Sequence, residues 1–145
     1  MISKKKNVRL ESDFALARLT TEEGLEPLKT LLRNLSHKSP ILGAAIFSVE
    51  GLPFVSHFNS GVEEVSVAAM VASIQAVGEQ TVKELRQGEL KSIIIQGTRG
   101  TTLTISISHG YLLTVTAPEN AKLGLIFNDA KICAREATRL LEDII

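Results

Sequence analysis

Residues that could carry out chemistry are sparse in this sequence. The three histidines, His37, His57 and His109, are far apart, and no spacing among them is typical of shared metal ligands. Cys133 is the only cysteine, and its position on an alanine-containing helical stripe predicts a small buried side chain more readily than a nucleophile. These residue types therefore predict neither a catalytic site nor a metal site.

Glycine-rich and acidic segments lead to the same expectation. The GTRG segment at 97–100 lies between two predicted strands, where a hairpin turn is more plausible than a phosphate-binding loop, and the pattern GxxxxGK[ST] is absent. Glu63 and Glu64 begin a predicted helix, where carboxylates suit the positive end of the helix dipole. One tyrosine and no tryptophan provide no stacking platform for nucleic acid. We expect a non-enzymatic protein with no cofactor and no nucleic-acid partner.

The bulk composition is that of an ordinary globular domain. The chain has 145 residues, of which 44% are hydrophobic, and 16 basic residues balance 16 acidic ones. No global charge favours nucleic acid or an acidic membrane. No apolar run approaches the roughly 20 residues that span a bilayer, and no apolar run follows Lys4–Lys6 as it would in a signal peptide. We expect a cytoplasmic protein without stable membrane insertion.

The pattern of elements divides the chain into two parts. Residues 1–19 are expected to form a basic, partly flexible N-terminal extension, and residues 20–145 a single domain. Within the domain, hydrophobic periodicity and turn residues predict helix, two strands, helix, three strands and helix. The expected ranges are 20–38, 41–49, 52–58, 62–87, 90–96, 101–108, 111–117 and a last helix from about 121 to 144.

Short turns between neighbouring strands predict a mostly antiparallel sheet. Helices on both of its faces would make a three-layer α+β sandwich.

The long helix, 62–87, is the most unusual element because it is apolar on two sides. At about 100° per residue, its large apolar side chains fall on one side, which we expect to pack on the sheet. These are Val67, Met70, Val71, Ile74, Val77, Val82 and Leu85.

The opposite side of this helix carries mostly small apolar residues. Such a strip favours close contact with a helix of a second copy, although alanines also simply stabilise exposed helices. The residues of this predicted dimer interface are Val65, Ala68, Ala69, Ala72 and Ala76.

The segment KSIIIQ supports self-association. It begins the three-strand meander, so it can lie at a sheet edge, where Ile93, Ile94 and Ile95 would favour pairing with a second copy. The alternative is that the three isoleucines lie inside a sheet covered on both faces.

Three phrases together resemble the Roadblock family, also called the dynein light-chain Roadblock family. They are ILGAAIFSVEGLPFVS, then VAAMVASIQAVGEQTVKEL with GELKSIIIQG, and finally LLTVTAPENAKLGLIFNDAKICAREA. They cover roughly residues 25–145 in order, with Val49-Glu50 as a mild departure from the polar pair often found there. The resemblance implies five antiparallel strands, with one long helix on one face and two on the other. It also implies homodimers, or heterodimers with a paralogue.

The resemblance further implies a non-enzymatic platform that binds and regulates a small Ras-like GTPase across the paired long helices. Mapped onto this sequence, the candidate GTPase-binding residues are Ser73, Glu79, Gln80, Lys83 and Glu84.

An alternative is a small-molecule sensor of the PAS or GAF kind. It would need a cavity with convergent polar groups, some of which Thr102, Thr104, Ser106 and Thr114 could supply.

Overall fold

Five strands form one antiparallel sheet in the order β2-β1-β5-β4-β3. The computed structural model describes residues 22–58 and 61–144, so the predicted extension, 1–19, lies outside the described residues. The strands are β1 (Gly43–Ser48), β2 (Pro53–Phe58), β3 (Ser92–Gly97), β4 (Gly100–Ile107) and β5 (Tyr111–Pro118).

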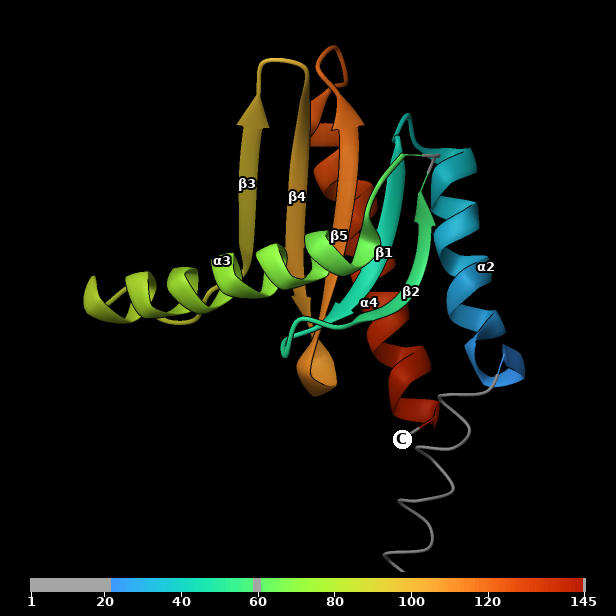
Figure 1. Cartoon of the computed structure of the whole chain (residues 1–145), viewed down its shortest axis with the longest axis horizontal. Helices are drawn as coiled ribbons and strands as arrows, with labels where there is room; N and C mark the ends of the chain where they lie inside the picture. The colour runs from blue at the N-terminus through green and yellow to red at the C-terminus, as the bar shows by residue number, and fades with distance from the viewer. Residues whose placement is uncertain (1–21, 59–60, 145) are drawn as a thin grey trace, which may run out of the picture.

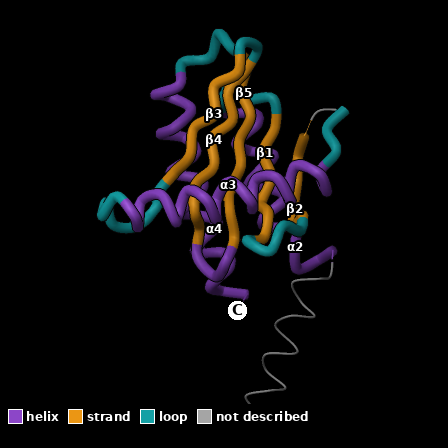
Figure 2. The backbone as a smooth tube through the Cα atoms, turned by 60° about the vertical axis from the view of Figure 1, so that its left-hand side comes forward, coloured by secondary structure: helices purple, strands orange, loops and turns teal. Residues whose placement is uncertain are grey.

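Helices cover both faces of this sheet. Helices α2 (Glu22–Lys38) and α4 (Leu123–Ile144) lie on one face, and α3 (Glu64–Glu84) crosses the other (Figures 1 and 2). The predicted three-layer sandwich and the order of its elements are therefore confirmed. The long helix is shorter at both ends than the predicted range of 62–87.

The main core lies between the sheet and the α2–α4 pair. Leu28 and Leu32 of α2 and Leu141 of α4 are fully buried against Ile46 and Leu113 of the sheet. Strand β1 is buried nearly throughout because it has neighbours on both edges and helices on both faces, as its unbroken apolar sequence predicts.

A smaller core lies between α3 and the other face of the sheet. Ala68 and Val71 of α3 pack there with Ala45, Phe47 and Leu112. The largest side chains in this layer belong to the sheet, and the helix contributes smaller ones.

The hairpin between β1 and β2 explains why small residues face inward. Gly51, with a φ of 92°, comes so near to α3 that a Cβ built on it would lie 3.4 Å from the Cα of Ala69 and 3.7 Å from the Cβ of Ala72. A larger residue at Ala68 or Ala72 would push the helix away from the hairpin and the sheet.

The predicted orientation of α3 was therefore wrong. Ala68 and Ala72 are buried within the chain, so they are not available to a second copy. Four of the large residues that were assigned to the sheet are exposed instead. These are Met70, Ile74, Val77 and Leu85.

This packing predicts that leucine destabilises the fold at one position of α3 and has little effect at another. Ala68→Leu should lower the free energy of unfolding by about 1–3 kcal/mol, because the added side chain has no space between α3 and the sheet. The control is Ser66, an exposed residue of the same helix, and Ser66→Leu should change the free energy of unfolding by no more than about 0.5 kcal/mol. Urea unfolding at one protein concentration measures both values, and equal values would contradict the observed orientation of α3.

Candidate protein-interaction surface

The outward face of α3 presents apolar side chains to solvent. Val65 and Val77 are 71% and 67% exposed, and Met70 and Ile74 are exposed beside them. The helix also runs past β3, so its C-terminal part projects beyond the sheet (Figure 1). This projecting part has no sheet beneath it.

Two shallow depressions lie along the C-terminal half of α3. The first, of about 440 Å³, lies where the helix meets the start of β3, and it includes Ile74, Leu90 and Ile93. The second, of about 550 Å³, includes Ala76, Gln80, Thr81, Glu84 and Leu85. Val77 and Thr81 line both, so they lie between the two depressions.

Strand β3 is a free edge of the sheet, as predicted. It pairs with β4 alone among the described strands, with Ile94 opposite Leu103. Ile94 and Ile95 are each 44% exposed, and Ile93 is partly buried beside Gly78 of α3. The alternative of a sheet covered on both faces does not hold at β3, because Ile94 and Ile95 are exposed on opposite faces.

Alternation along β3 divides the three isoleucines between the faces of the sheet. Ile93 and Ile95 lie on the α3 face, and Ile94 lies on the opposite face. The apolar face of α3 thus continues onto β3 through Ile93.

The predicted dimer interface is only partly accessible. Val65, Ala69 and Ala76 are exposed on α3, whereas Ala68 and Ala72 are buried within the chain, as described above. The structure adds Met70, Ile74 and Val77 to the exposed apolar surface.

These large residues were missed because bulky apolar side chains on a helix usually mark its buried face. The one contrary signal in the sequence was Gly78, which falls on the same side as Ala68 and Val71 and allows close approach to Ile93.

The predicted GTPase-binding residues do not all share one face. Ser73, Gln80 and Glu84 lie on the outward face at helical spacing. The Ser73 hydroxyl donates to the Ala69 carbonyl at 2.9 Å, and the Gln80 amide donates to Glu84 at 3.0 Å.

The other two candidates, Glu79 and Lys83, are exposed on one flank of α3. The Gln75 amide donates to the Glu79 carboxylate at 3.1 Å, which ties Glu79 to the inner side of the helix.

The polar groups proposed for a small-molecule sensor interact with one another and with α3. The hydroxyls of Thr104 and Thr114 are buried and lie 3.1 Å apart. Gln75, only 3% exposed, donates from its amide to the Ser106 hydroxyl at 2.8 Å. Thr104 and Thr114 thus interact with each other and Ser106 interacts with α3, so these three hydroxyls already have a partner within the chain.

The described residues provide no metal-binding cluster, and their one cysteine is buried. Residues 22–58 and 61–144 contain no cluster of three or more His, Cys, Asp or Glu side chains that could hold a metal ion. Cys133 is buried, and burial first, then the nearby Glu136, raises its pKa from 9.0 to about 11. Its thiolate is therefore scarce at neutral pH.

No helix among the described residues is long and apolar enough to cross a membrane.

Comparison with known families identifies the fold. The family model for the Roadblock/LC7 domain matches residues 27–117. The chain belongs to the Roadblock/LC7 family. Two uncharacterized proteins of Methanocaldococcus jannaschii are each 29% identical to it over 96 residues, which span 66% of this chain and 83% of each relative.

Solved structures show the same fold at lower identity. MglB of Myxococcus xanthus aligns with a TM-score of 0.81 at 16% identity, covering 87% of this chain and 96% of MglB. A structure described as MglB with tetrameric arrangement aligns with a TM-score of 0.78 at 19% identity, covering 83% and 91%. The resemblance that the sequence predicted is therefore confirmed at the level of family and fold.

The burial of Cys133 predicts slow reaction with thiol reagents in this Roadblock/LC7 domain. At pH 8 the native protein should react far more slowly with Ellman's reagent than the urea-unfolded protein, because both access and thiolate population are low. Equal rates in the two states would contradict the buried position.

The raised pKa of Cys133 also makes the stability of the fold depend on pH. The folded state holds the thiol proton more tightly, so the stabilisation from this group is complete below pH 9.0 and is lost as the pH rises through about 11.

Proposed function

We propose that this Roadblock/LC7 protein is a non-enzymatic homodimeric scaffold that binds and regulates a small Ras-like GTPase in the cytoplasm. The observation that carries the proposal is the continuity of the exposed apolar face of α3 with the unpaired edge of β3. Contiguous apolar patches and open sheet edges are both typical of protein interfaces.

A second copy related by a twofold axis beside β3 would cover both features. Antiparallel pairing of the two β3 strands would satisfy their free backbone groups and join the two sheets. The same axis would bring the projecting parts of the two α3 helices together, with Val77 and Ile74 between them. A paralogue with the same surface could replace the second copy.

The dimer contact that we propose differs from the small-residue contact that the sequence predicts. The accessible members of that prediction, Val65, Ala69 and Ala76, remain in the proposed surface. The larger Ile74 and Val77 stand nearer to β3 because both line the depression where α3 meets the start of that strand. Ile93, Ile94 and Ile95 supply the strand contact.

The polar residues of α3 are the proposed contacts for the GTPase. Ser73, Gln80 and Glu84 point outward, and Glu79 and Lys83 flank them, so two copies would present a mixed polar surface across the paired helices. Membership of the Roadblock/LC7 family supports this role, because the resemblance implies platforms for Ras-like GTPases. The exposed bond between Gln80 and Glu84 can be exchanged for bonds to a partner at little cost.

Regulation by such a scaffold would act on the GTPase's own residues. Among the described residues, no group of three or more His, Cys, Asp or Glu side chains could hold a metal ion for such a reaction. Acceleration or slowing of GTP hydrolysis would follow from ordering the catalytic segments of the partner.

A charge at Val77 should abolish the dimer. Val77→Arg places a cation at the centre of the proposed interface, so light scattering should give the mass of one chain where the native protein gives that of two. Leu125→Arg is the matched control, since Leu125 of α4 is similarly exposed, at 61%, on the other face of the sheet. A native monomer, or a dimer that survives Val77→Arg, would refute this interface.

Charge reversal on the outward face should weaken GTPase binding without dissociating the dimer. The probe is a Ras-like GTPase from the same genome, loaded with GDP or with a non-hydrolysable GTP analogue. Binding should depend on the nucleotide, and Gln80→Lys with Glu84→Lys should raise the Kd at least about tenfold, equivalent to ~1.4 kcal/mol.

Glu142→Lys on α4 is the control for added positive charge and should leave the Kd unchanged. The double variant must remain dimeric by light scattering. If every Ras-like GTPase of that genome binds equally in both nucleotide states, or none binds at all, the regulatory proposal fails even if the dimer is correct.

A further inference from the structure

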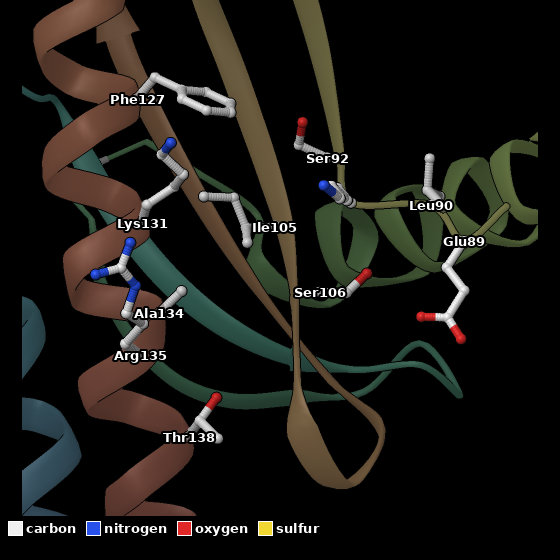
Figure 3. A pocket seen from close by; sticks show the side chains of 11 residues that line it. Glu89, Leu90, Ser92, Ile105, Ser106, Phe127, Lys131, Ala134, Arg135 and Thr138 are labelled. Carbon is white, nitrogen blue, oxygen red and sulfur yellow. The ribbon is translucent and has the colours of Figure 1, made fainter. Parts of the chain in front are cut away.

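A third hollow lies mainly on the face of the sheet opposite α3. It is a groove of about 530 Å³ between α4 and the segment that leads into β3, with β4 between them (Figure 3). Phe127, Lys131 and Arg135 lie on its α4 wall, and Glu89 lies on the opposite wall (Figure 3). Neither the dimer contact nor the GTPase contact proposed above uses these residues.

The groove exists because α4 does not cover the sheet as far as β3, and its lining combines apolar side chains with the hydroxyls of Ser92, Ser106 and Thr138. Ile105 and Ala134 close it from β4 and α4, and Leu90 and the Phe127 ring form its sides. Beside it, Ile94 is left 44% exposed on this same face of the sheet.

The rim of the groove is predominantly cationic. Lys91, Lys131 and Arg135 line it against a single carboxylate, Glu89, although the whole chain has no net charge. Among the described residues, none of the three cations has a carboxylate within 4.0 Å, whereas the nearby Arg139 pairs with Glu136. The ammonium of Lys131 instead lies 5.0 Å from the centre of the Phe127 ring.

We propose that this groove binds an acidic segment of a partner protein, in which carboxylate residues alternate with apolar ones. The carboxylates would pair with Lys91, Lys131 and Arg135, and the apolar side chains would cover Ile105 and Phe127. Such a segment complements both the charge and the floor of the groove.

Two other occupants fit the groove less well. A small anion would gain little, because Lys131 and Arg135 are exposed to solvent and the anion would leave Ile105 and Phe127 uncovered. The chain's own residues 1–9 are basic and would be repelled by the rim. Charge and apolar area together therefore favour an acidic polypeptide.

The test uses the full chain and a short fluorescein-labelled peptide of alternating glutamate and leucine, followed by fluorescence anisotropy. The native protein should bind this peptide and should bind it more weakly as salt is raised. The double variant Lys131→Glu with Arg135→Glu should raise the Kd at least about tenfold. Arg139→Glu, which reverses an exposed charge on the same helix outside the groove, should change the Kd less than about twofold.

Two further peptides separate the sources of binding. A peptide of alternating lysine and leucine should not bind, and a polyglutamate peptide should bind more weakly because it lacks apolar contacts. Equal binding of polyglutamate, or competition by inorganic phosphate at the same affinity, would overturn the proposal in favour of a non-specific cationic surface.

Failure of the glutamate–leucine peptide to bind, or equal Kd values for the native protein and the groove variant, would also overturn the proposal. Circular dichroism checks that the variants are folded, and their changes lie at exposed positions. The Val77→Arg variant should bind the peptide like the native chain, so this result does not depend on the dimer or on the GTPase.

Discussion

The close approach of α3 to the sheet is the contact on which the rest of the α3 surface depends. Ala68 and Ala72 lie between the helix and the β1–β2 hairpin, where Gly51 leaves no room for bulk. Gly78 lets the same helix approach Ile93 at the start of β3. Because small residues occupy this layer, the large apolar residues of the helix are turned outward.

A partly buried hydrogen bond favours this rotation of α3. Gln75 faces the sheet, and its amide bonds to Ser106 across the layer and to Glu79 along the helix. If the helix rotated to bury Ile74 or Val77, this hydrogen bond to Ser106 would be lost, and a typical hydrogen bond contributes about 0.5–1.5 kcal/mol. This polar contact therefore favours the observed rotation of α3, while the apolar contacts stabilise the packing of the helix on the sheet.

The two faces of the sheet consequently present different surfaces. On the α3 face, a broad apolar area reaches the free edge of β3, a geometry suited to a second folded copy. On the α4 face, the helix stops short of β3 and leaves a narrow groove with cationic walls, a geometry suited to an extended acidic chain. One uncovered strand thus generates both surfaces, because neither α3 nor α4 covers β3 completely.

The sequence by itself determined the family, the order of elements, the antiparallel sheet and the edge position of β3. These follow from local signals: hydrophobic periodicity within each element, short turns between strands, and the place of KSIIIQ at the start of the meander. The exposed position of Val65, Ala69 and Ala76 also followed from periodicity. What only the tertiary structure decided is the rotation of α3, and with it the burial of Ala68 and Ala72.

The rotation of α3 could not be predicted from its sequence because both of its faces are apolar. Hydrophobic periodicity identifies the buried face only when one face is clearly more apolar than the other. The choice between them depends on the space that remains above Phe47 and Leu112 and beside Gly51, which belong to strands and a turn distant in sequence. The groove beside α4 is equally a tertiary feature, since it depends on how far α4 extends across a sheet whose last strand lies beyond its reach.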